Sequence, residues 1–109
     1  MTDGAITVTH LSDRERYHAE IDEGGAPVEV GYIDYTRDPN HPDGDHLALT
    51  HTVVYDRFGG RGYAAELVRQ VLDDVRASGN KVVPVCSYVV RYLEKHPEYS
   101  DLVVSSTRS

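Results

Sequence analysis

The sequence predicts an α+β domain with a mixed, mainly antiparallel sheet of about five strands and two helices. In the first half of the chain, apolar and polar residues alternate with a period of two, as in strands that bury one face. After Gly62 the apolar residues recur every three or four positions, as along one face of a helix. A short apolar run then returns, and this order of strand, helix and strand favours a parallel pair.

The four strands expected in the first half are short and bounded by turn-forming residues. Gly31 is a candidate bulge position in the third strand. In the fourth strand, alternation places His51 on the same face as Leu49 and Val53, which predicts apolar surroundings for this histidine. We expect the strands at 5–10, 16–21, 28–35 and 46–55, with a turn at 22–27 and a polar loop at 37–45.

An apolar stripe predicts a helix of about four turns after the fourth strand. Gly79 is its candidate C-cap. The run 81–86 predicts a fifth strand, in which Pro84 implies a bulge or the end of the ladder. Ser87 is a candidate cap for a second helix, which Pro97 ends. The stripe consists of Ala64, Leu67, Val68, Val71, Leu72 and Val75.

Length and composition restrict the classes of function. The 109 residues fit one domain spanning 1–109, with a polar tail at 105–109 that we expect to fray. No apolar run is long enough to span a bilayer, no signal peptide is visible, and the single cysteine, Cys86, fits a reducing cytoplasm. The formal net charge of −7 argues against nonspecific nucleic-acid or membrane binding and mildly favours a cationic partner such as an amine.

Three glycines within four residues join the fourth predicted strand to the first helix, in the stretch DRFGGRGYA. The first turn of a helix carries unpaired N–H groups and partial positive charge, and glycine lets backbone approach a phosphate closely. Arg57 and Arg61 add candidate charge-assisted hydrogen bonds.

Two known phosphate-binding motifs do not fit this loop. The nucleotide P-loop does not match, because the chain has no Gly-Lys pair. The dinucleotide pattern fails as well, since Ala65 takes the place of its third glycine and several antiparallel strands come first. The loop therefore predicts either an anion site or a plain turn.

The loop and its position resemble the GNAT superfamily of acetyl-CoA-dependent acyltransferases. The family's pyrophosphate loop, [Q/R]-x-x-G-x-[G/A], fits GGRGYA, with Gly62 and Ala64 at the two small positions. The departure is Gly59, where the family usually has Gln or Arg, and Arg57 and Arg61 are the candidates for the missing donor.

Three further motifs narrow the resemblance to a small one-domain branch of that superfamily. They are THT at 50–52, KVVPVC at 81–86 and HPEY at 96–99, and the resemblance runs from about residue 17 to about 103. Members of this branch lack the usual helices between the first two strands, which fits the short connection at 11–15.

The resemblance implies acetyl-CoA as co-substrate and assigns its binding to backbone groups. Pantetheine would pair with the backbone of Val53 and Val54, and the Val54 N–H would also polarise the thioester carbonyl. Their valine side chains can pack in the core at the same time. Arg57 would assist the loop that binds the pyrophosphate, which consists of Phe58, Gly59, Gly60, Arg61, Gly62, Tyr63 and Ala64.

Three side chains are candidates for the chemistry. His51 is either a general base or a hydrogen-bonded core histidine. Cys86 is an inert buried thiol, a wall of the acetyl site, or a nucleophile activated by His51 or His96. By resemblance Tyr92 stands where members often place the general acid for the leaving thiolate.

Rival assignments exist for the acid and for the whole site. Tyr88 and Tyr99 compete with Tyr92, and simple helix packing is the alternative for all three. A metal site is not expected, because His46 and His51 are an odd number of residues apart and so face opposite ways on a regular strand. The other residues of that candidate cluster are His41, Asp43 and Asp45.

The function that the sequence favours is direct transfer of an acetyl group from acetyl-CoA to an amine. The first alternative is a coenzyme-A-binding or regulatory module without transferase activity. The second alternative is a protein-interaction domain in which the glycine loop is only a turn.

Overall fold

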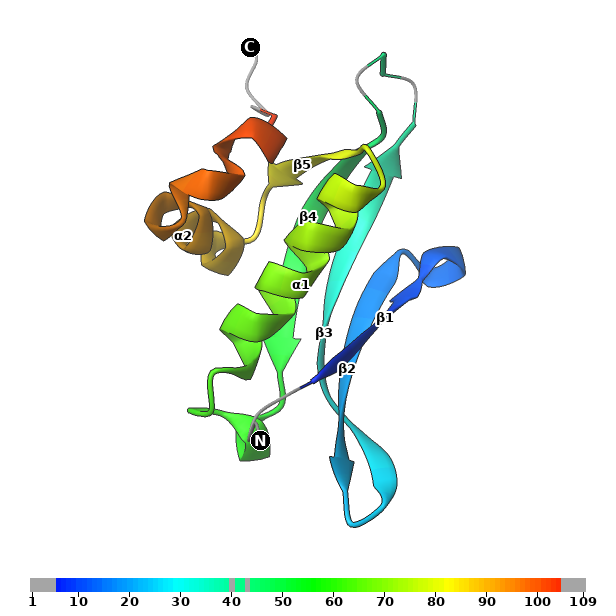
Figure 1. Ribbon diagram of the computed structural model, residues 1–109, viewed down its shortest axis with the longest axis vertical. Helices are drawn as coiled ribbons and strands as arrows, with labels where there is room; N and C mark the ends of the chain where they lie inside the picture. The colour runs from blue at the N-terminus through cyan, green and yellow to red at the C-terminus, as the bar shows by residue number, and fades with distance from the viewer. Residues whose placement is uncertain (1–5, 40, 43, 105–109) are drawn as a thin grey trace.

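The computed structural model describes residues 6–39, 41–42 and 44–104, and these form one five-stranded mixed sheet (Figure 1). The first four strands pair antiparallel, and the fifth runs parallel to the fourth, which confirms the predicted α+β class. The expected fraying tail at 105–109 lies outside the described residues. In spatial as in chain order, the strands are β1 (Thr7–Leu11), β2 (Arg16–Glu23), β3 (Ala26–Asp38), β4 (His46–Val54) and β5 (Lys81–Pro84).

Between β1 and β2 the chain makes only a 3₁₀ turn, at Ser12–Arg14. All residues of this connection are described, and they contain no α-helix. The connection is as short as the sequence predicted, so β1 and β2 form a tight antiparallel hairpin at one edge of the sheet.

Helix α1 (Tyr63–Ala77) lies across one face of the sheet and supplies much of the core (Figure 1). In its apolar stripe, Ala64 is half-buried and the other five residues are fully buried against side chains such as Ile33 of β3 and Leu49 of β4. Each such buried aliphatic side chain stabilises the fold by about 1.5–3 kcal/mol. The helix ends at Ala77, and Ser78 rather than the predicted Gly79 is its C-cap. Gly79 comes next and has φ +76°, while the Asn80 N–H donates to the Val75 carbonyl at 3.0 Å.

A bulge in β4 changes which way its second half faces. The pairing with β3 passes from Asp34 opposite His51 to Tyr35 opposite Leu49, so Thr50 is an extra residue without a partner of its own. Leu49 is buried, but His51 is exposed on the face of β2–β4 opposite α1, which we call the outer face. The prediction that His51 lies among apolar neighbours is therefore wrong, because the bulge breaks the alternation.

A second bulge lies beside Gly31, as the sequence suggested. Gly31 pairs with Ala19, and Val30 is the extra residue of β3. A Cβ on Gly31 would lie 2.1 Å from the Val53 carbonyl oxygen, so this close approach of β3 and β4 requires glycine.

Strands β4 and β5 separate where β5 ends. Their parallel pairing stops at Leu49 opposite Pro84, which has no N–H to continue a ladder. The N–H groups of Val85 and Cys86 both donate to the Leu49 carbonyl, at 3.2 and 2.9 Å. Among the described residues, no strand pairs with this edge of β4 beyond Leu49, which leaves a V-shaped opening.

Helix α2 (Ser87–Lys95) begins at this opening. Cys86 rather than Ser87 occupies the N-cap position, because Cys86 has an extended backbone while its carbonyl already accepts the Val90 N–H at 3.0 Å. Pro97 ends the helix as predicted and starts a 3₁₀ segment, Pro97–Leu102.

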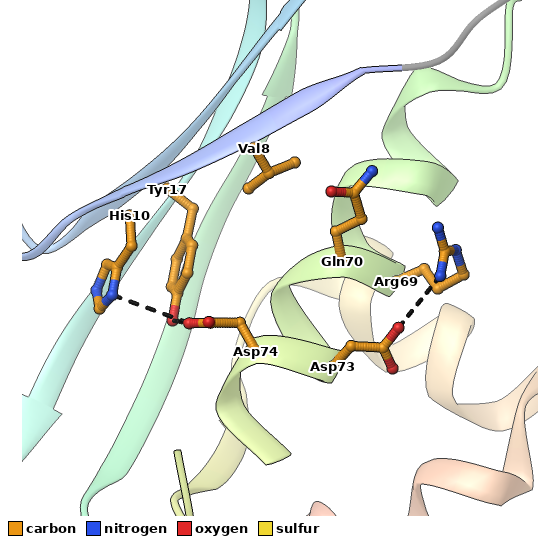
Figure 2. A pocket seen from close by; sticks show the side chains of 7 residues that line it. All are labelled: Val8, His10, Tyr17, Arg69, Gln70, Asp73 and Asp74. Carbon is orange, nitrogen blue, oxygen red and sulfur yellow. Dashed lines mark hydrogen bonds and ion pairs between the residues drawn. The ribbon is translucent and has the colours of Figure 1, made fainter. Parts of the chain in front are cut away.

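Side chains that line the hollow between β1 and α1 hold the edge of the sheet against the helix (Figure 2). The Tyr17 hydroxyl donates to Asp74 at 2.8 Å, and the His10 ring stacks on Tyr17 at 4.1 Å. Arg69 pairs with Asp73 at 3.2 Å in the same hollow. Its charged side chains therefore bind one another, and we interpret the hollow as a packing contact.

Candidate active site

The glycine loop leaves open space at the start of α1. Gly60 and Gly62 have φ of +78° and +80°, values that favour glycine. Gly62 is the N-cap of α1 and makes no side-chain cap hydrogen bond, and the first bond of the helix runs from the Glu66 N–H to the Gly62 carbonyl. The N–H groups ahead of Glu66 therefore have no acceptor within the helix. A Cβ on Gly60 or Gly62 would meet no atom within 4 Å, so an anion can approach this backbone.

Phe58 anchors the glycine loop, and the two arginines near its ring, Arg57 and Arg61, differ in their contacts. Its ring is 2% exposed, at the end of a 3₁₀ turn that follows β4 (Asp56–Phe58). Arg57 lies over this ring at 4.2 Å and pairs with Glu23 at 3.3 Å. Arg61 lies 5.9 Å from the same ring and has no anionic partner among the described residues. Arg61 is therefore the better placed cation for a phosphate.

A groove of about 440 Å³ runs between the first turn of α1 and one side of α2, and we call it the α1–α2 groove. Arg91 and Lys95 lie four residues apart on α2, so they share one face of the helix. Neither cation has an acidic partner among the described residues, although the chain carries a net charge of −7. Two unpaired cations in one groove favour an anionic ligand. The lining residues are Ala65, Tyr88, Arg91, Tyr92, Lys95 and His96.

Cys86 lies at the V-shaped opening, with its sulfur 3.5 Å from the Thr52 hydroxyl oxygen. Burial raises the pKa of the thiol. The hydrogen bond with Thr52 and the N–H groups of Val89, Tyr88 and Thr52 act against burial and leave the pKa below its ordinary value. The environment therefore favours thiolate, although the thiol is half-buried.

The two histidines proposed to activate Cys86 lie elsewhere. His51 is on the outer face, where its Nδ1 lies 3.1 Å from the Thr50 hydroxyl oxygen. His96 follows the far end of α2, stacks on Tyr92 at 4.0 Å and pairs with Glu98 at 3.4 Å. The structure thus brings Cys86 together with Thr52 and with neither histidine.

The three candidate tyrosines have different environments. Tyr99 donates its hydroxyl hydrogen to Asp73 at 2.7 Å, and burial together with this bond raises its pKa to about 12. Tyr92 is 9% exposed, and Tyr88 is 37% exposed in the first turn of α2. Burial raises the pKa of both phenols, and both line the α1–α2 groove. Tyr99 is committed to α1, so Tyr88 and Tyr92 are the two that a ligand in the groove can reach.

A family model described as GCN5-related N-acetyl-transferase matches residues 16–102. The chain belongs to this family. The match includes β2 to β5 and both α-helices, and it confirms the resemblance indicated by the glycine loop and the three shorter motifs. GCN5-related N-acetyltransferases typically use acetyl-CoA as the acyl donor and an amine as the acceptor.

Solved structures share this fold at low sequence identity. The solution structure of a GCN5-like protein from Staphylococcus aureus has a TM-score of 0.60 and 24% identity, over 99% of this chain and 95% of that one. The crystal structure of a ribosomal-protein-alanine N-acetyltransferase from Brucella melitensis biovar Abortus 2308 has a TM-score of 0.54 and 20% identity, over 92% and 71%. At these identities the likeness shows the fold alone. No curated protein matches the chain.

In this GCN5-related fold, Val53 and Val54 lie on the part of β4 that extends past the end of β5. On their other side they pair with Tyr32 and Gly31 of β3, and Val54 packs against the core. The Tyr55 N–H donates to the Val30 carbonyl of β3, so by alternation the backbone groups of Val53 face β3 and those of Val54 face the open edge. The Val54 backbone can therefore meet an extended ligand, while its side chain serves the core.

The bulge also removes the parity argument against a metal site, since it places His46 and His51 on the same face. Within the described residues, no three potential ligands gather to hold a metal, and His41 stacks on His46 at 3.6 Å. Asp43 lies outside the described residues. No helix of the described chain combines the length and apolar character needed to cross a bilayer.

Proposed function

We propose that the protein transfers an acetyl group from acetyl-CoA directly to an amine. The observation that carries this proposal is the α1–α2 groove, in which Arg91 and Lys95 have no acidic partner among the described residues. Its wall on α1, Ala65, comes directly after the glycine loop in the chain. A long ligand that carries phosphates at one end and an extended arm at the other fits the glycine loop, these cations and the free edge of β4.

Each part of the site has a role in this proposal. The N–H groups of the loop from Phe58 to Ala64 bind the pyrophosphate, with Arg61 closest to its charge. The free edge of β4 aligns the extended arm through the backbone of Val54, with Val53 beside it, and the Val54 N–H polarises the carbonyl to be attacked. Acetyl-CoA supplies the acetyl thioester.

In this proposal two side chains handle the protons, His51 on the outer face and Tyr92 in the α1–α2 groove. His51 accepts a proton from the amine as the amine attacks the carbonyl carbon, and the carbon–sulfur bond breaks. Tyr92 donates a proton to the departing thiolate, and Tyr88, which is more exposed in the same groove, is its rival. Cys86 lines the acetyl site without forming an acyl-enzyme, since neither histidine contacts it.

A coenzyme-A-binding module without transferase activity is the second candidate. Two observations favour it. His51 does not line the groove, and Tyr92 is nearly buried in stacking contact with His96, so neither is openly placed for proton transfer. In either case the lone half-buried thiol fits a reducing compartment such as the cytoplasm.

Release of the coenzyme A thiol separates the two candidates. The protein is incubated with acetyl-CoA and a panel of amines, including polyamines and lysine peptides, and free thiol is followed with a chromogenic disulfide. We expect release that depends on the amine and falls about 10²-fold or more in His51→Gln. Binding of acetyl-CoA with no release above the rate without amine would leave the binding module as the function.

A further inference from the structure

The bulge in β4 brings the side chains of Thr50 and His51 together. In a regular strand neighbouring side chains point to opposite faces, but here His51 Nδ1 lies 3.1 Å from Thr50 Oγ1. Thr50 is the residue left without a partner between Leu49 and His51 in the ladder with β3. Bulges commonly redirect a side chain in this way.

The hydrogen bonds of Thr50 determine where the proton on His51 lies. Thr50 Oγ1 is 3.2 Å from the main-chain oxygen of Asp34, and a carbonyl oxygen can only accept. The hydroxyl has a single hydrogen, which is used in this bond. With that hydrogen on the Asp34 carbonyl, Thr50 Oγ1 accepts from His51, and the neutral imidazole then carries its hydrogen on Nδ1 and a free lone pair on Nε2.

We propose that Thr50 is a positioning residue that fixes His51 in the Nδ1–H tautomer and thereby makes Nε2 the proton acceptor on the outer face. The inference rests on the proposed function in one respect, namely that the proton comes from the acceptor amine. When Nε2 takes that proton, Nδ1 keeps its hydrogen and its bond to Thr50. The imidazolium therefore forms without any change in ring orientation, and the exposed Nε2 then releases the proton to water.

The charged groups near His51 bind one another and do not hold its ring, so Thr50 sets the orientation of the ring. Asp34 lies opposite His51 in the ladder, but its carboxylate is held by Arg16 of β2 at 2.6 Å. Arg16 in turn lies over the Tyr32 ring at 3.8 Å. Among the described residues, no carboxylate bonds to His51, so the hydroxyl of Thr50 is its anchor.

Imidazole nitrogen chemical shifts test the tautomer directly and independently of any activity. Long-range ¹H–¹⁵N spectra are recorded at a pH high enough for the histidine rings to be neutral. The His51 signals are identified by their loss in His51→Gln. We expect Nδ1 to give the shift of a protonated nitrogen and Nε2 that of an unprotonated one. In Thr50→Val, which has the same shape without the hydroxyl, the pattern should move toward the Nε2–H form, and Thr50→Ser should keep the wild-type pattern. A wild-type His51 protonated on Nε2, or an unchanged pattern in Thr50→Val, overturns the proposal.

Kinetics test the consequence for transfer. Thr50→Val should lower kcat for amine-dependent thiol release about tenfold, part of the 10²–10⁴-fold that a positioned base contributes, without changing acetyl-CoA affinity. Thr50→Ser should restore kcat, and an unchanged kcat in Thr50→Val overturns the positioning role. If the tautomer is as proposed and the wild-type protein transfers no acetyl group, the proposed function fails while the assignment of the proton on His51 stands.

Discussion

The sulfur of Cys86 lies 3.5 Å from the hydroxyl oxygen of Thr52, across the point where β4 and β5 separate. This contact connects the start of α2 to the free edge of β4. It also places the only thiol of the chain beside the part of β4 that is proposed to align the thioester.

Removal of the Thr52 hydroxyl should make Cys86 less reactive. The bond with Thr52 is the largest contribution that lowers the pKa of the thiol against the effect of burial, so Thr52→Val should raise that pKa. Because the thiolate is the reactive form, alkylation of the variant by iodoacetamide should require a higher pH than alkylation of the wild type. The matched control, Thr52→Ser, keeps a hydroxyl and should keep the wild-type profile. Identical pH profiles in wild type and Thr52→Val would contradict the role given to this bond.

Substitution of Gly62 should abolish acetyl-CoA binding at a limited cost in stability. The space around its missing Cβ is open, so the cost of Gly62→Val comes from φ of +80°, about 1–2 kcal/mol. The added side chain would stand where the phosphates meet the backbone. Gly25→Val is the matched control, because Gly25 has φ of +86° and equally open space in the β2–β3 turn. Calorimetry should show lost binding in the first variant and wild-type affinity in the second.

Neutralising the cations of the α1–α2 groove should weaken coenzyme A binding and its dependence on salt. Arg91→Gln and Lys95→Gln should each reduce affinity about two- to fivefold, the range expected for exposed ion pairs. Arg14→Gln makes the same change of charge in the turn between β1 and β2, and should leave affinity unchanged. Titrations at low and high salt measure both effects. Equal loss in all three variants would mean that only net charge matters.

Alkaline pH should destabilise the fold partly through Tyr99. Burial, and then the bond to Asp73, raise the pKa of this phenol to about 12, while its unfolded value is about 10. The protonated phenol is thus favoured by folding, and its contribution is complete below pH 10 and is lost as pH rises toward 12. Tyr99→Phe should cost about 1 kcal/mol at neutral pH and reduce the fall in unfolding free energy over that window. Urea denaturation at several pH values measures both.

The parts of the fold that depend on a segment's own residues were predictable. The stripe of α1 and the end of the ladder at Pro84 follow from local periodicity and from the missing N–H of proline. The orientation of His51 was not predictable, since the bulge at Thr50 depends on the register with β3. Arg91 and Lys95 were missed for a similar reason. Their four-residue spacing is visible in the sequence, but the groove exists only through the packing of α2 beside α1.

Binding of acetyl-CoA is the most direct test of the central claim, and thermal unfolding measures it without knowledge of the acceptor. At about 100 times its dissociation constant, the ligand should stabilise the fold by roughly 2.7 kcal/mol. For a domain of this size the melting temperature should rise by about 10 °C or more. Gly62→Val should show no such rise, while Gly25→Val should respond as the wild type does. An unchanged melting temperature of the wild-type protein at millimolar acetyl-CoA would contradict the cofactor site, and the proposed transfer with it.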